Sequence, residues 1–348
     1  MKVRFSTGVL LLAGACAAPE SLPQAAEARD TLTYFAGGLT QAELDELARV
    51  APRMRVVAGL TRTQALERAA EAHGADGFYA TPEFLARATN LAWVQAMSAG
   101  VDRYMSNAVL VGSERIVLTN MQGVHGPAIA DHAFGMLLAL TRDLSFYARE
   151  QEAARWTPGG TGRAIALQGK TMLVVGLGGI GTEIAERAAG FGMRVIATRR
   201  SDAPGPVFVE RVGRSEDLLA MLPEADVVAI AVPLTAATER MFGATAFAAM
   251  KPGAILINVA RGRVVDTAAL LDSLRSGRLA GACLDVTDPE PLPPDHPLWR
   301  EPNVLITPHV ASDAELTDAR AWALLRENLR RFGAGEPLLN VVDKQAGY

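Results

Sequence analysis

The stretch Val174-Val175-Gly176-Leu177-Gly178-Gly179-Ile180-Gly181 decides the fold of this 348-residue chain. The apolar run Thr171–Val175 predicts a strand buried on both faces, and a G-x-G-x-x-G turn follows it. Apolar residues then recur at helical spacing, at Ile180, Ile184, Ala188 and Phe191. A strand, a glycine turn and a helix in this order are typical of dinucleotide binding. Gly176 permits the tight turn, Gly178 lets the backbone approach a pyrophosphate, and Gly181 allows close packing of helix and strand.

The tip of the next strand, Arg194–Thr198, predicts which dinucleotide binds. NAD-binding versions usually carry an acidic residue there, which accepts a hydrogen bond from the ribose 2′-OH. Here the tip continues with Arg199 and Arg200, and the first acid, Asp202, comes later. Two guanidinium groups can bind the 2′-phosphate of NADP. We therefore expect NADP(H) to be favoured, with NAD(H) as the alternative. A solvated basic loop would give the same pattern.

Composition excludes several classes of protein. The length suffices for two domains, and a net charge of −4 argues against a nucleic-acid partner. The two cysteines, Cys16 and Cys283, support neither a disulfide framework nor a zinc site. We interpret Cys283 as a buried small hydrophobe. His125 and His132 have no metal-ligand partner in register, so we interpret them as structural residues and predict no metal site.

Residues 1–28 differ from the rest of the chain. Basic residues precede the apolar run Val9–Leu12 and small residues follow it, which is the layout of a secretory signal. Cleavage after Ala15 or Ala17 fits this layout, and Cys16 somewhat resembles a lipoprotein acceptor. The apolar run is too short for a membrane span. Because nicotinamide cofactors are supplied in the cytosol and no twin-Arg pair is present, export to the periplasm and a cytoplasmic location both stay open.

Strands and helices alternate from about residue 30, which predicts parallel sheets covered by helices. The expected strands and helices of the first part are Thr31–Phe35, Thr40–Val50, Arg55–Val57, Thr63–His73, Gly77–Tyr79, Ala92–Val94 and Ile116–Leu118. Pro127–Glu150 is expected to form one long helix, so apolar in its middle that it must be buried between domains or subunits. The last expected helix, Ala314–Phe332, ends at Gly333 and returns to the first domain.

The expected fold is therefore α/β, with two Rossmann-like or flavodoxin-like domains built on parallel sheets. A nucleotide-binding domain, residues 123–309, is inserted in a discontinuous substrate-binding domain, residues 30–122 and 310–345. In open sheets of this kind ligands bind beyond the carboxyl ends of the strands.

Three functional side chains follow three predicted strands at that edge. Arg261 follows Ile255–Val259, Glu290 follows Ala282–Val286, and His309 follows Val304–Ile306; the sequence therefore brings a base, an acid and an imidazole to one edge. Hydride transfer to a ketone leaves an alkoxide that needs a proton, and a histidine suits this task. A neighbouring carboxylate favours the imidazolium and orients it, and a guanidinium binds a carboxylate or carbonyl.

These residues lie in segments that resemble the D-isomer-specific 2-hydroxy-acid dehydrogenase family. Asn258–Asp266 resembles its catalytic-arginine segment, Leu284–Leu292 its glutamate segment, and Thr307–Ser312 its proton-donor segment. The resemblance spans about residues 31–342 and implies catalytic roles for Arg261, Glu290 and His309. The spacings of 29 and 19 residues between these three are like those of family members.

The resemblance also implies the binding residues and the partners. Ser98, Ala99 and Gly100 would hold the substrate carboxylate together with Arg261. The expected cofactor contacts are Gly176, Gly178, Gly179, Ile180, Gly181, Arg199, Arg200, Val232, Pro233, Thr235, Thr238, Val259, Ala260, Arg261, Asp285 and His309, with Asp285 at the nicotinamide carboxamide. Asp131 departs from the glutamate of many members. Family members are mostly homodimers joined through a helix like 127–150.

The sequence thus predicts an NAD(P)-dependent 2-keto-acid reductase that acts on a small acid such as glyoxylate or hydroxypyruvate. A rival within the same class is an oxidation of formate or phosphite. Formate enzymes of this family usually lack the glutamate, so Glu290 argues against the formate reaction. The alternatives from other classes are a cofactor-binding sensor or corepressor-like protein with little turnover and a surface-tethered scaffold. The sequence does not rank Met97, Tyr104 or Met121 as pocket residues.

Overall fold

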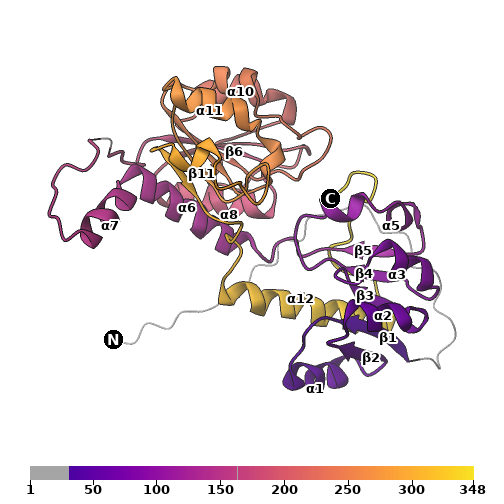
Figure 1. The fold of residues 1–348 in the computed structure, drawn as a ribbon. Coiled ribbons are helices and arrows are strands. Elements are labelled where there is room, and N and C mark those ends of the chain that lie inside the picture. Colours follow the sequence, from indigo (N-terminus) through magenta and orange to yellow (C-terminus); the bar gives the residue numbers. More distant parts are fainter. Residues whose placement is uncertain (1–30, 163) are drawn as a thin grey trace, which may run out of the picture.

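The computed structural model describes residues 31–162 and 164–348, which form two parallel sheets in two lobes (Figure 1). The first sheet has the strand order β2-β1-β3-β4-β5. Its strands are β1 (Leu32–Ala36), β2 (Met54–Ala58), β3 (Gly74–Asp76), β4 (Trp93–Gln95) and β5 (Val117–Thr119). Its helices are α1 (Gln41–Val50), α2 (Arg62–Glu67), α3 (Pro82–Arg87), α4 (Asp102–Met105) and α5 (Ala108–Gly112).

The second sheet has the order β12-β11-β10-β9-β6-β7-β8. Its strands are β6 (Thr171–Val175), β7 (Arg194–Thr198), β8 (Arg211–Gly213), β9 (Val227–Ile230), β10 (Ala254–Asn258), β11 (Leu279–Leu284) and β12 (Val304–Ile306). The helices of this part are α6 (Gly126–Thr141), α7 (Leu144–Glu152), α8 (Gly179–Gly190), α9 (Leu218–Met221), α10 (Ala244–Ala249) and α11 (Thr267–Arg275). Apolar residues of α6 and α8 join the core on one face of the sheet, and those of α9, α10 and α11 join the core on the other.

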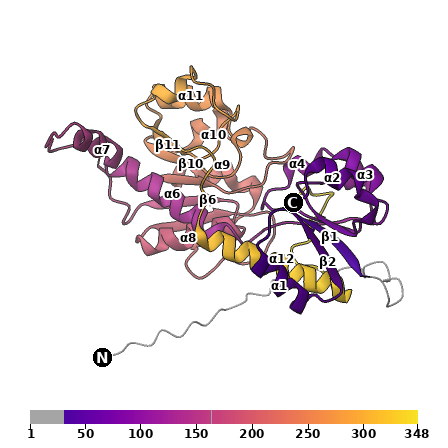
Figure 2. The same cartoon turned by 60° about the horizontal axis from the view of Figure 1, so that its bottom comes forward.

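The last helix, α12 (Glu315–Ala334), returns from the second lobe to the first (Figure 2). It packs against α1 and β2, where Leu325 and Leu329 are buried beside Trp93. The first domain is therefore built from both ends of the described chain, with the second domain inserted, as predicted for the fold class. The limits given above for the two domains stay a prediction.

Three predicted elements are wrong in their extent. Residues 77–79 form a turn, because the strand ends at Asp76, whose carboxylate accepts hydrogen bonds from the Tyr34 hydroxyl and the Gly37 N–H. The helix predicted over 63–73 covers only Arg62–Glu67 and continues as a 3-10 turn. The last helix continues through Gly333 to Ala334, and Gly335 caps it with a φ of 71°, in the left-handed conformation that glycine favours.

The long helix predicted over 127–150 is two helices, α6 and α7. The chain breaks at Asp143, which adopts φ 56°, a conformation that Asp tolerates better than most residues. The Asp143 carboxylate accepts hydrogen bonds from the N–H and hydroxyl of Thr161 at 2.9 and 2.7 Å. One side of α6 is buried as expected, but Gly135 on its other side is exposed. Helix α7 projects from the second lobe away from the first (Figure 1).

Candidate active site

The glycine turn between β6 and α8 has the geometry that a dinucleotide requires. Gly176 has φ 101°, and a Cβ atom there would lie 2.7 Å from the Ala231 carbonyl oxygen. A Cβ atom on Gly181 would collide with the Gly176 carbonyl oxygen, so both positions need glycine. At Gly178 an added Cβ would meet nothing within 4 Å. The N-terminus of the 12-residue helix α8 thus faces open space, which fits a pyrophosphate.

The tip of β7 adjoins this turn and carries the two arginines. The Thr198 carbonyl accepts hydrogen bonds from the N–H groups of Gly176 and Leu177. The Arg199 guanidinium donates to the carbonyls of Ala203 and Pro204 at 3.2 Å, so its loop holds it. Arg200 differs, since within residues 31–162 and 164–348 its guanidinium makes neither a hydrogen bond nor an ion pair and contacts only the ring of Tyr348. Of the two arginines, Arg200 is the freer to bind a phosphate.

His309 and Glu290 form the pair predicted from their strands. The His309 Nδ1 atom lies 2.6 Å from Glu290 Oε1, and both side chains are about two-fifths exposed. His309 has φ 58°, in the left-handed region. A non-glycine residue there needs support from its surroundings. The pair leaves the other imidazole nitrogen, Nε2, available to a substrate.

Asp285 supplies that support. Its buried carboxylate accepts hydrogen bonds from the Thr307 hydroxyl at 2.7 Å and from the N–H groups of Val310 and Ala311 at 3.0 Å. Its carbonyl oxygen accepts a bond from the His309 N–H at 2.8 Å. These bonds engage both carboxylate oxygens of Asp285. The expected contact of Asp285 with a nicotinamide carboxamide stays a prediction.

His132 on α6 joins the same network, which sequence reasoning missed. Its Nε2 atom lies 2.9 Å from the Thr307 hydroxyl and 3.6 Å from the Asp285 carboxylate. The helical position of His132 gave no sign of this contact, since 175 positions separate it from Thr307. The loop that carries His309 is thus fixed by Asp285, which follows β11, and by His132 on α6.

Arg261 reaches from the second domain to the first. Its Nε atom lies 3.1 Å from the Asp102 carboxylate, and a Cβ atom on Gly100 would collide with its Nη2 atom. The N–H groups of Ser98, Ala99 and Gly100 make no hydrogen bond to other described residues. The structure therefore brings a guanidinium next to free backbone donors, which is an arrangement suited to a carboxylate.

The remaining predicted contacts follow β9 and β10. The Thr238 hydroxyl donates to the Pro233 carbonyl at 2.6 Å and accepts from the Thr235 N–H at 2.8 Å, which fixes the turn that begins at Val232. The buried Asn258 side chain accepts from the Ala260 N–H and donates to the Arg261 carbonyl, which shapes the backbone at Val259 and Ala260. Tyr104 and Met121 are buried core residues, whereas Met97 is 40 % exposed.

Comparisons with known proteins show which family the chain belongs to. The model of the D-isomer specific 2-hydroxyacid dehydrogenase NAD-binding domain matches residues 134–311. The chain is 40 % identical to a glyoxylate reductase of Korarchaeum cryptofilum over 237 residues, which cover 66 % of this chain and 70 % of that one. It is 37 % identical to a glyoxylate/hydroxypyruvate reductase B of Salmonella newport over 255 residues, with 72 % and 77 % covered.

Among solved structures, a D-isomer specific 2-hydroxyacid dehydrogenase of Xanthobacter autotrophicus in complex with NADPH and MES superposes with a TM-score of 0.78. It is 31 % identical, and the match covers 92 % of this chain and all of that one. The fold, the glycine turn and the matched family model define an NAD(P)-dependent oxidoreductase. The chain belongs to the D-isomer specific 2-hydroxyacid dehydrogenase family.

Proposed function

We propose that this protein reduces a small 2-keto acid to the D-2-hydroxy acid. The observation that carries the proposal is the His309–Glu290 pair, at 2.6 Å, beside an arginine that spans two domains. The bound nicotinamide cofactor supplies the hydride that C2 of the keto acid accepts. His309 gives a proton from its imidazole to the keto oxygen, and Glu290 orients the ring and stabilises its charged form.

Arg261 and the backbone of Ser98–Gly100 hold the substrate. The planar guanidinium binds the carboxylate or the keto oxygen, and the N–H groups of the loop bind the carboxylate. The Ser98 hydroxyl bonds to the Gly100 carbonyl at 2.7 Å, and the Asn120 amide bonds to the Ala99 carbonyl, so the loop is preformed. We propose glyoxylate or hydroxypyruvate as the substrate, supported by the names of the relatives described above.

We propose further that NADP(H) is favoured over NAD(H). The support is the position of Arg200, which follows β7 beside the glycine turn and makes no ion pair in the described part of the chain. A related solved structure holds NADPH. An arginine without a competing carboxylate is available to the 2′-phosphate.

The oxidation of NADPH and NADH at 340 nm tests this function. Glyoxylate, hydroxypyruvate, pyruvate and phenylpyruvate are offered in parallel to the full-length protein. The proposal predicts turnover with glyoxylate or hydroxypyruvate, faster with NADPH than with NADH at equal low concentrations. Clear NADPH binding without turnover of any of these acids would favour the sensor alternative, which the comparisons do not support.

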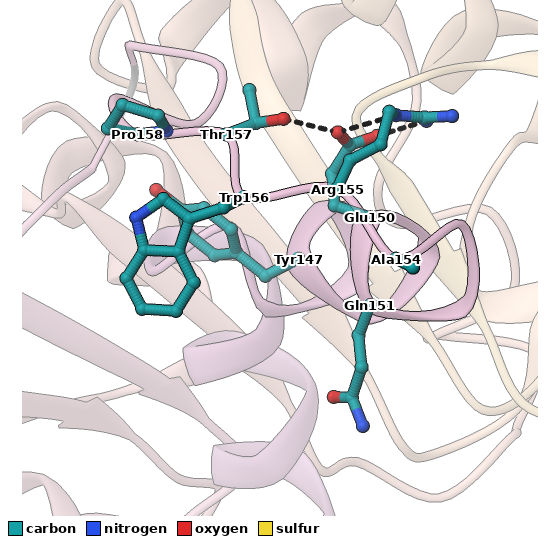
Figure 3. Close-up of a pocket in the computed structure, with 8 residues that line it drawn as sticks. All are labelled: Tyr147, Glu150, Gln151, Ala154, Arg155, Trp156, Thr157 and Pro158. Atoms are coloured by element: carbon teal, nitrogen blue, oxygen red, sulfur yellow. Dashed lines mark hydrogen bonds and ion pairs between the residues drawn. The ribbon is translucent and has the colours of Figure 1, made fainter.

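For the oligomeric state we propose a homodimer joined through α6 and α7. The side chain of Trp156, just after α7, is 97 % exposed, and Leu144 and Tyr147 on α7 are exposed too. A hollow of about 630 Å³ lies between α7 and the segment that follows it, with Tyr147 and Trp156 on its wall (Figure 3). Exposed apolar groups on a projecting arm are typical of a protein interface.

Sedimentation of the wild-type protein and of Trp156→Asp tests the dimer. The proposal predicts a dimer for the wild type and a shift towards monomer for the variant. Trp299→Asp serves as the matched control. Trp299 is also exposed but lies outside α7 and the segment that follows it, and its indole N–H donates to the Pro293 carbonyl. A monomeric wild type at micromolar concentration would contradict the proposal.

For residues 1–28 we propose a secretory-type signal. Export to the periplasm is the favoured location, and the cytoplasm is the alternative location. These residues lie outside the described part of the structure. Among the described residues, no helix combines the length and apolar character that crossing a membrane requires. The mass of the protein isolated from its native host tests the proposal, because removal after Ala15 or Ala17 lowers the mass by the residues lost.

A further inference from the structure

The segment Asp343–Tyr348 of the first domain touches the second domain at the tip of β7. The guanidinium carbon of Arg200 lies 4.3 Å from the centre of the Tyr348 ring. This distance is that of a cation–π contact. The contact joins the first domain to Arg200, the residue that we propose recognises the 2′-phosphate of the cofactor.

The segment is firmly placed on the first domain. The Lys344 ammonium donates to the carbonyls of Leu110, Ser113 and Ile116, which lie around α5. Just before it, Val342 is buried and its N–H donates to the Leu118 carbonyl at 2.8 Å. The end of the first sheet therefore fixes where the segment lies.

The segment also closes on itself. The Asp343 carboxylate accepts from the N–H groups of Gln345 and Ala346 at 2.9 Å. The Asp343 carbonyl accepts from the Gly347 N–H at 2.8 Å, and the Asp343 N–H donates to the Tyr348 carbonyl at 3.1 Å. A turn with this many internal bonds fixes the backbone that carries the Tyr348 ring.

The two arginines at the tip of β7 are held by different means. Arg199 is bound by loop carbonyls, and nearby Arg214 pairs with Asp202 at 2.5 Å. Arg200 has only the Tyr348 ring as a partner among the described residues. An aromatic face restrains a guanidinium without using its N–H groups. These groups therefore stay free for a phosphate.

We propose that Tyr348 is a positioning residue that presents Arg200 to the 2′-phosphate of NADP(H), so that the first domain contributes to cofactor selection. This proposal rests on the NADP(H) preference proposed above. It places a determinant of cofactor choice about 170 residues away from the glycine turn in sequence and on the other domain.

Calorimetric titration with 2′,5′-ADP and with ADP tests the proposal without catalysis. The two probes differ in the 2′-phosphate and lack the nicotinamide. Tyr348→Ala is expected to weaken 2′,5′-ADP about 3- to 10-fold and to leave the ADP affinity within about twofold. Tyr348→Phe keeps an aromatic face and is expected to restore most of the 2′,5′-ADP affinity. Equal weakening of both probes, or no change in either, would overturn the proposal.

A double-variant cycle with Arg200→Gln shows whether Tyr348 acts through Arg200. The proposal predicts that Arg200→Gln weakens 2′,5′-ADP and that adding Tyr348→Ala then has no further effect. Additive effects would overturn it. Arg211→Gln, which removes a charge on neighbouring β8 that pairs with Glu224, is the control for general electrostatics and is expected to keep the ratio of the two affinities.

The same titrations separate this inference from the cofactor preference on which it rests. If Arg200→Gln weakens 2′,5′-ADP and Tyr348→Ala does not, the role of Tyr348 is wrong and the preference stands. If Arg200→Gln leaves 2′,5′-ADP unchanged, the role assigned to Arg200 is wrong, and the role of Tyr348 is overturned with it.

Discussion

Arg261 and Asp102 form an ion pair across the two domains, with 3.1 Å between Nε and Oδ1, although 159 positions separate them in sequence. Each residue is about one-third exposed or less. The pair holds the guanidinium over the backbone of Gly100, where a larger residue would collide with it. The proposed substrate site is therefore built from residues of both domains.

Replacing Arg261 with lysine should impair both binding and turnover. Lysine keeps the charge but loses the planar fork that binds a carboxylate. We expect the KM for the keto acid to rise and kcat/KM to fall about 100-fold or more, measured by initial rates. Arg263→Lys is the control, since Arg263 is exposed and pairs with Glu239. Wild-type kinetics for Arg261→Lys would contradict the assigned role.

Removing the imidazole of His309 should slow turnover without loss of cofactor binding. General acid catalysis contributes about 10²- to 10⁴-fold, so we expect kcat of His309→Gln to fall by this factor. The dissociation constant of NADPH, from fluorescence titration, should stay within about threefold. His296→Gln is the control, because His296 caps a 3-10 turn. Near-normal turnover of His309→Gln would show that another group gives the proton.

Two glycines of α8 should respond in opposite ways to alanine. At Gly181 the added Cβ collides with the Gly176 carbonyl, whereas at Gly190 it meets nothing within 4 Å. Gly181→Ala is expected to lower the melting temperature and to abolish cofactor binding. Gly190→Ala is expected to be neutral or slightly stabilising. Differential scanning calorimetry with and without NADPH checks both variants; equal behaviour would mean that the turn is not as tight as described.

Stability should fall in mild acid because of His125, at the start of α6. Burial lowers the pKa of His125 below its usual value, and its Nδ1 atom has no hydrogen-bond partner among the described residues. A lowered pKa in the folded state means that this stability is present above the unfolded-state pKa of about 6.5 and is lost as the pH falls through the folded-state pKa.

Urea unfolding of the wild type and of His125→Gln between pH 7.5 and 5 measures this effect. The drop in the free energy of unfolding should be smaller for the variant. Equal slopes for the two proteins would show that His125 is not the group that titrates.

Much of the site followed from the sequence because it lies in local patterns. The strands before Arg261, Glu290 and His309 are short apolar runs, and parallel strands place their carboxyl ends at one edge. This was enough to predict the 2.6 Å pairing partners Glu290 and His309. The glycine turn was predictable for the same reason, since strand, turn and helix are consecutive.

Two contacts between distant residues could not be predicted. The sequence around His132 carries no local signal of its partner Thr307. The same holds for Tyr348 and its partner Arg200, which follows β7. The break at Asp143 was hidden because helical spacing continues on both sides, while the left-handed backbone there is stabilised by Thr161, 18 residues later. Tertiary hydrogen bonds of this kind override local helix preference.

The transfer of deuterium tests the central claim most directly. The full-length protein is incubated with hydroxypyruvate and NADPH that carries deuterium at both positions of C4 of the nicotinamide, and the product is examined by mass spectrometry and chiral chromatography. The account predicts D-glycerate with deuterium at C2, formed by the wild type and at least about 100-fold more slowly by His309→Gln. L-Glycerate, or a product without deuterium, would contradict it.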